Sequence, residues 1–112
     1  MLTRSVLERF ETIDVYLSPV MTAPAPAIGD IAGASVDPAT IMRRQTALFP
    51  YAALFNFTGQ PSISLPLAAA PSGLPIGMMF TARYADEATL FRLASQLELE
   101  IGWAGGRPAI WN

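Results

Sequence analysis

The chain has 112 residues, of which 52% are hydrophobic and only 14% charged, with a net charge of −2 and a mean hydropathy of +0.36. It contains no His and no Cys, and all seven of its cations are Arg. These absences remove the usual ligands of zinc, iron–sulfur and haem sites and the commonest general bases and activated nucleophiles, so we expect no metal and no cofactor. Without Lys, and with a negative net charge, the chain is not expected to bind nucleic acid. The length suits one domain, or a piece of a larger one.

A helix and a strand are predicted first. Apolar spacing indicates a helix over residues 2–11, and the β-branched and aromatic run at 12–18 predicts a strand. The centre of that strand, Val15 to Leu17, has no polar break, which is typical of a strand covered on both faces. Residues 1–10 lack the apolar core of a signal peptide, so a cytoplasmic location is expected.

A long loop and two helices follow. Residues 19–36 are rich in Pro and Gly and predict a loop that forms a functional wall, a lid or a mobile segment. Asp37 is the predicted N-cap of the next helix, with Pro38 at its first position, and Pro50 kinks or ends it. Residues 51–57 predict a second short helix, apolar nearly all round and therefore buried, with Gly59 as its stop.

Two strands and a helix complete the predicted order. Residues 62–67 and 76–81 are separated by a short Pro-Ser-Gly turn, which makes them antiparallel neighbours. Pro66 places the end of the first strand at an edge or a bulge. Asp86 is the predicted cap of the final helix, whose apolar stripe ends before Gly102.

The middle of the chain could be mistaken for a membrane span. Between Arg44 and Arg83 lie 38 residues without a charge, but five of them are prolines. Prolines break a spanning helix and leave backbone groups unpaired in lipid, so no membrane partner is expected. Deep burial within a protein is the better interpretation.

Few residues suggest chemistry of their own. Asp86 and Glu87 are sequence neighbours, which do not face each other on a helix, so capping is favoured over an acid–base pair. Ser62 and Ser64 share one face of a strand, but no His or Lys is present to take their protons. Hydrogen bonding on a sheet face is favoured for both.

The other polar and aromatic candidates have structural explanations as well. Asn56, Thr58 and Gln60 could fix a substrate amide, although holding a helix end or a turn is commoner. Arg43 and Arg44 could bind an anion, with a solvated helix face as the default. Trp103 and Trp111 could stack on a ligand, but packing of a C-terminal tail is commoner.

Three segments in order carry a resemblance to a known family. IDVYLSPVMTAPAPAIG, LFNFTGQPSISLPL and GLPIGMMFTARYADEATLFRLASQLE resemble the C-terminal part of amidase signature enzymes. The likeness covers residues 12–98. It implies an α/β fold, a mixed β-sheet flanked by helices, with residues 1–112 forming a single partial domain.

The resemblance also implies that the catalytic residues lie in a part of the enzyme other than this chain. Enzymes of this family hydrolyse amide bonds with a Ser–cis-Ser–Lys triad that lies upstream of the matched part, and this chain has no Lys. No catalytic residue is therefore carried over, and the chain alone is expected to be inactive. Phe49 and Ala53 match positions that face the acyl site, where Phe49 suggests an apolar or aryl acyl group. The implied substrate of the complete enzyme is a small-molecule amide.

Two further expectations concern partners. A part of a larger domain exposes faces built to be covered, so we expect homo-oligomerisation or association with the remaining portion of the amidase, and poor solubility without such cover. The alternative is a non-catalytic oligomerisation or ligand-binding module derived from an amidase. Catalysis by carboxylates alone fits least, because the middle of the chain is so poor in charge.

Overall fold

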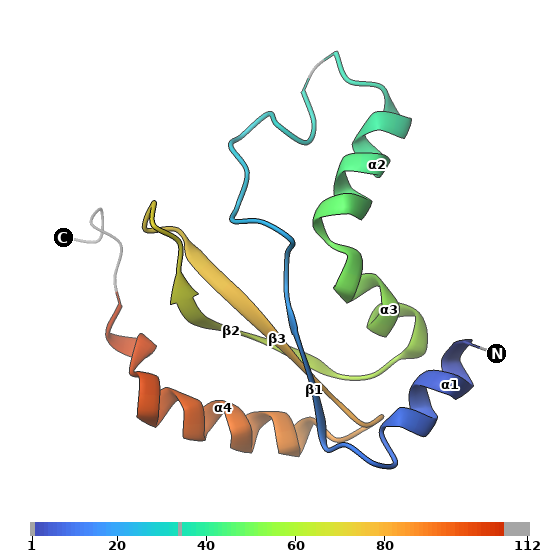
Figure 1. Cartoon of the computed structure of the whole chain (residues 1–112), viewed down its shortest axis with the longest axis vertical. Coiled ribbons are helices and arrows are strands. Elements are labelled where there is room, and N and C mark those ends of the chain that lie inside the picture. Colours follow the sequence, from blue (N-terminus) through green and yellow to red (C-terminus); the bar gives the residue numbers. More distant parts are fainter. Residues whose placement is uncertain (1, 34, 107–112) are drawn as a thin grey trace.

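The computed structural model describes residues 2–33 and 35–106. Its elements are, in chain order, α1 (Leu2–Arg9), β1 (Val15–Pro19), α2 (Pro38–Leu48), α3 (Pro50–Thr58), β2 (Ser62–Ala69), β3 (Pro75–Ala82), α4 (Glu87–Ile101) and the 3₁₀ turn η1 (Trp103–Gly105). The strands form one sheet in the order β1-β3-β2. Both pairings are antiparallel, so β1 and β2 run parallel to each other on either side of β3. Figure 1 shows this sheet between α4 on one side and α2 and α3 on the other.

Each face of the sheet carries its own apolar cluster. The cluster under α4, which we call the α4-side core, is built from Leu65, Phe80, Ala82 and Leu90. The cluster on the opposite face, the α3-side core, joins Phe10 of the turn after α1 and Phe55 of α3 to Met79 of the sheet. Alternating residues of β3 therefore serve different cores, as the period of two requires. The predicted α/β class, a sheet flanked by helices, is confirmed.

The helix ends follow the predicted capping chemistry. The Asp37 carboxylate accepts the Thr40 N–H at 3.0 Å, and Pro38 begins α2. Asp86 accepts the N–H and hydroxyl of Thr89, which fixes the start of α4 and confirms capping over an acid–base role. Gly59 ends α3 in the left-handed region at φ 80°, where a side chain would be strained.

The strand pairing confirms the predicted hairpin and its irregular end. Register shifts between Pro66 and Ala68, so the proline sits at a bulge of an edge strand. β1 begins at Val15 rather than at residue 12, because the N–H and hydroxyl of Thr12 both bond to the Arg9 carbonyl and extend the turn after α1.

Several apolar residues are less covered than the sequence predicts. The α3 helix was expected to be buried, but within it only Phe55 and Thr58 are buried, and Phe57 is 84% exposed. The α2 helix has no buried residue at all. β1 was expected to be covered on both faces, yet Leu17 is 53% exposed. The physical reason is the same in each case. An apolar sequence pattern indicates that side chains are suited to burial, but the described part of this chain does not supply enough other residues to cover all of them.

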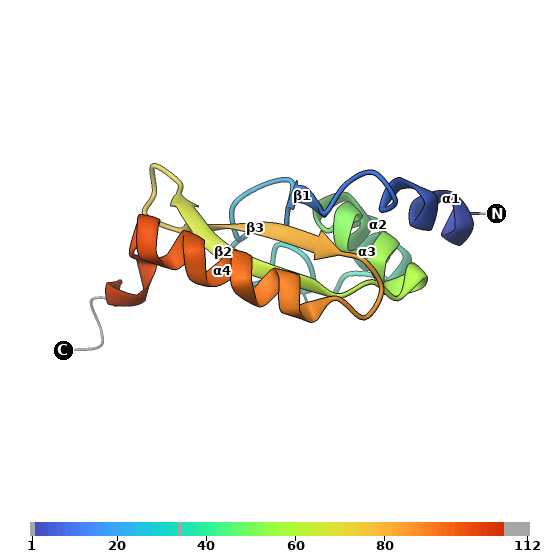
Figure 2. The ribbon, with the colours of Figure 1, turned by 90° about the horizontal axis from the view of Figure 1, so that it is seen from below.

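The overall dimensions agree with that explanation. The radius of gyration is 16.5 Å, in a slab of 45 × 41 × 20 Å, whereas a compact domain of this length has a radius of gyration of about 13 Å. Figure 2 shows how thin the molecule is when it is viewed along the slab. None of the described helices is long and apolar enough to cross a membrane.

Candidate functional site

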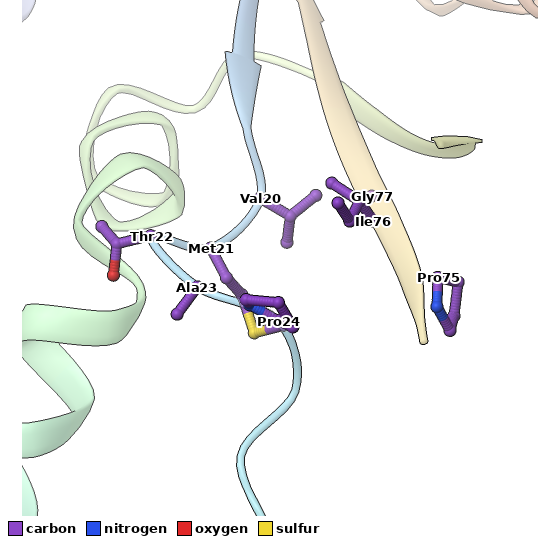
Figure 3. A pocket seen from close by; sticks show the side chains of 8 residues that line it. All are labelled: Val20, Met21, Thr22, Ala23, Pro24, Pro75, Ile76 and Gly77. Atoms are coloured by element: carbon purple, nitrogen blue, oxygen red, sulfur yellow. The ribbon is translucent and has the colours of Figure 1, made fainter. Parts of the chain in front are cut away.

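One hollow on the sheet lies where the loop after β1 passes the start of β3. It is a pocket of about 160 Å³ lined by residues 20–24 of the loop and by Pro75, Ile76 and Gly77. Figure 3 shows Val20 beside Gly77, with Met21, Thr22, Ala23 and Pro24 following along the loop. The backbone fixes this arrangement, because the N–H of Val20 bonds to the Gly77 carbonyl at 3.0 Å and continues the β1–β3 pairing.

Gly77 allows the loop to lie this close to the sheet. A Cβ placed on Gly77 would lie 2.9 Å from the Ser64 Oγ and 3.0 Å from the Val20 Cγ2. Both distances are shorter than ordinary van der Waals contact. The floor of the pocket therefore requires the absence of a side chain at this position.

After Val20, which is bonded to the sheet, the loop is attached to α2. Thr22 donates its backbone N–H to the Leu48 carbonyl at 3.1 Å and its hydroxyl to the Ala47 carbonyl at 3.0 Å. These bonds satisfy carbonyls at the C-terminal end of α2 that have no partner within the helix. Arg44 donates to the Asp30 carbonyl at 2.7 Å. Loop and helix thus form one wall beside the pocket.

Arg43 and Arg44 are both exposed, which agrees with the solvated helix face favoured for them, and Arg44 in addition holds the loop. Its neighbour Arg43 donates instead to the Thr40 hydroxyl within α2, at 3.2 Å. The sequence identified the arginine pair but gave no indication that one of them holds the loop, because its partner is a backbone carbonyl 14 residues away.

This attachment yields a testable prediction. Replacing Arg44 with Ala removes the bond to the loop, and a net hydrogen bond worth about 1 kcal/mol corresponds to roughly fivefold more frequent local opening. Hydrogen–deuterium exchange of peptides covering residues 27–32 measures this. Arg43→Ala is the matched control and is expected to leave the exchange unchanged. Equal exchange in the two variants would contradict the role given to Arg44.

Hydroxyl groups line the sheet face opposite α4, and among the described residues none of them is hydrogen-bonded to an acidic side chain. Ser62 and Thr81 are paired in register, with their hydroxyl oxygens 2.7 Å apart. Ser18 is buried and its Oγ has no hydrogen-bond partner in the described part of the chain. The favoured interpretation of Ser62, hydrogen bonding on a sheet face, is confirmed.

The pKa of Asp37 also indicates a structural role. Hydrogen bonds from the side chain and the N–H of Thr40 hold the pKa of the Asp37 carboxyl below its ordinary value. That is the signature of a helix cap and not of a general base. Within residues 2–33 and 35–106, no group of three or more acidic side chains is placed to hold a metal ion. The pocket can accept an apolar group, but it holds no group that could move a proton.

The remaining polar and aromatic candidates also have structural roles. Thr58 donates to the Leu54 carbonyl and contacts Gln60, so these two residues hold the end of α3, as the commoner interpretation proposed. Asn56 is exposed. Trp103 packs against the α4-side core, and Trp111 lies outside the described residues.

Phe49 and Ala53 lie one helical turn apart at the start of α3. Phe49 is the junction between α2 and α3, is 36% exposed, and caps both helices. Ala53 is exposed in the first turn of α3, four residues after Phe49. Neither residue lines the pocket in Figure 3. The pocket residues were missed as a set, because only the β1–β3 register brings residues 20–24 to residues 75–77.

Comparison with known proteins identifies the class that this fold and these segments define. A family model described as Amidase matches residues 1–91, and the chain belongs to this family. It is 41% identical over 103 residues to a putative amidase, AmiC, of Mycobacterium leprae (strain TN), covering 92% of this chain and 22% of that protein. It is 34% identical over 106 residues to the 6-aminohexanoate-cyclic-dimer hydrolase of Pseudomonas sp. (strain NK87), covering 88% of this chain and 21% of that protein.

A solved structure of a 6-aminohexanoate cyclic dimer hydrolase complexed with substrate matches the fold. The TM-score is 0.87 at 30% sequence identity, with 98% of this chain and 24% of that chain covered. The resemblance to the C-terminal part of an amidase is thereby confirmed. The chain spans about a fifth of the length of the curated relatives that it matches.

Proposed function

We propose that this chain is the part of an amide-bond hydrolase that builds sheet strands and one wall of the substrate pocket, and that it does not hydrolyse amides by itself. The observation that carries the proposal is the match of nearly the whole chain to a quarter of a solved amide hydrolase. The amino-acid composition supports the proposed lack of activity of the chain by itself, since the chain has no Lys, His or Cys to activate a nucleophile. The bond-breaking groups would come from the rest of the enzyme.

The wall is proposed to present Phe49 and Ala53 to the acyl part of the substrate. Their exposure supports this role, because an exposed phenylalanine at a helix junction is available for contact. A phenyl ring offers an apolar surface and no hydrogen bond, so the favoured substrate is a small-molecule amide with an apolar or aryl acyl group. The solved relative's own substrate, a cyclic dimer of 6-aminohexanoate, is also a small amide.

Exchange of a single wall residue tests this assignment. The chain is co-produced with the Mycobacterium leprae relative from which the matching segment has been deleted, here called the remainder. In the complex of the chain with the remainder, Phe49→Ser is expected to lower kcat/KM for an aryl-acyl amide by about tenfold or more, since an apolar pocket contact is worth about 1–3 kcal/mol.

Met42→Ser is the matched control, because Met42 is also exposed and apolar but lies on α2 away from the junction. It is expected to leave kcat/KM unchanged. An equal loss in both variants, or no loss in either, would refute the placement of Phe49 in the pocket wall.

Two further sequence-based expectations belong to the same proposal. Homo-oligomerisation of the chain on its own is tested by size-exclusion chromatography with light scattering, where a clean monomer over a broad concentration range would count against it. A cytoplasmic location is tested by fractionation of cells producing the tagged chain.

A further inference from the structure

The two edges of the sheet are built very differently. β2 is protected as edge strands usually are, because it carries Pro66 and a bulge. β1 (Val15–Pro19) has a proline only at its last position, and it has no bulge in its pairing with β3 and no charged residue. In the described part of the chain, no backbone hydrogen bond reaches β1 other than those of its pairing with β3. An unprotected edge of this kind is a template for another strand.

Both faces of β1 are also left open. On the face shared with α4, Val15 packs against the α4-side core, but α4 packs mainly against β2 and β3 and Leu17 is left 53% exposed. On the other face, a groove of about 240 Å³ lies between α1, β1 and α3. Its apolar lining includes Phe10, Ile13 and Tyr16, and the Tyr16 ring lies 5.5 Å from that of Phe55.

The total exposed surface indicates how large the missing cover is. A compact monomer of 12.0 kDa exposes about 6,000 Å², whereas this chain exposes 8162 Å². The excess of roughly 2,000 Å² exceeds the 800 Å² or so that each partner buries in a standard interface. It lies within the roughly 1,000–2,500 Å² that each partner buries in an obligate interface, such as one between two parts of a single domain.

We infer that the β1 edge, together with Leu17 and the α1–β1–α3 groove, is the surface on which the remaining portion of the amidase docks, by adding a strand next to β1. The occupant follows from the comparison with the solved relative, in which the matched region is 24% of a longer chain, so that most of that polypeptide has no counterpart here. Strand addition satisfies the free backbone groups and covers both open faces of β1 at once. The inference rests on the proposed function and names the surface by which that function would be assembled.

A charge at the centre of this surface tests the inference. Leu17→Lys places an ammonium group where an apolar side chain is to be buried, and the cost of an unpaired buried charge is expected to reduce co-purification of the chain with the remainder by about tenfold or more. Leu99→Lys is the matched control, because Leu99 is 83% exposed on α4. Thermal unfolding of the isolated variants shows that both retain the fold, as is expected for substitutions at exposed positions.

The outcomes separate the docking surface from the proposed function. Loss of co-purification with Leu17→Lys but not with Leu99→Lys supports the surface. Equal co-purification of both variants overturns it, and so does failure of the unaltered chain to bind the remainder. Self-association that Leu17→Lys abolishes, without binding of the remainder, would assign the edge to a second copy and overturn the proposed occupant. A stable pair that hydrolyses no amide would overturn the proposed function and leave the surface intact.

Discussion

Replacing Leu90 with Ala is expected to lower the free energy of unfolding by about 2–5 kcal/mol, the range found when a buried leucine is truncated. Leu90 is 3% exposed and belongs to the α4-side core, where it joins Leu65 and Phe80. In this thin molecule α4 is the layer that covers one face of the sheet. A cavity at Leu90 therefore weakens the contact that holds the helix to the strands.

The same substitution at Leu99 provides the control. Leu99 lies on the same helix but is 83% exposed, so Leu99→Ala is expected to change stability by about 0.5 kcal/mol or less. Urea unfolding followed by circular dichroism measures both variants. Similar losses at the two positions would mean that α4 does not pack on the sheet as described.

Adding a methyl group at Gly77 is the second large effect expected. Gly77→Ala brings a carbon to 2.9 Å from the Ser64 Oγ and 3.0 Å from the Val20 Cγ2, and such overpacking costs about 1–3 kcal/mol. Val20 cannot withdraw freely, because its N–H is bonded to the Gly77 carbonyl. The loop after β1 is therefore expected to move away from β3 and to open the pocket shown in Figure 3.

A double-mutant cycle isolates the cause. Ser64→Ala removes the oxygen that the new methyl group meets, so it is expected to recover part of the stability that Gly77→Ala loses. Gly105→Ala is the control, because a Cβ at Gly105 meets no atom within 4 Å. Additive effects of Ser64→Ala and Gly77→Ala would refute the close contact.

Local structure was predictable wherever a few neighbouring residues decide it. Asp37 and Asp86 begin helices because a short carboxylate reaches the N–H groups of the first turn, and Gly59 ends one because it tolerates a positive φ. The β2–β3 hairpin follows from a short turn between two strand-forming segments. None of these features requires knowledge of a distant residue.

The site was less predictable because it depends on contacts between distant segments. The β1–β3 pairing brings residues 20–24 to Gly77, and Arg44 reaches the carbonyl of Asp30 in the loop. Burial was overpredicted at Phe57 and Leu17 for a related reason. Their apolar character indicates that both side chains are suited to burial, but it does not identify the polypeptide that covers them.

The most direct test of the account is a comparison of initial rates of amide hydrolysis. The purified chain is assayed alone, the remainder alone, and the two together, with an aryl-acyl amide as substrate. The account predicts turnover only in the combined sample, since this chain brings the pocket wall and no group that can activate a nucleophile. Turnover by the purified chain on its own would contradict it.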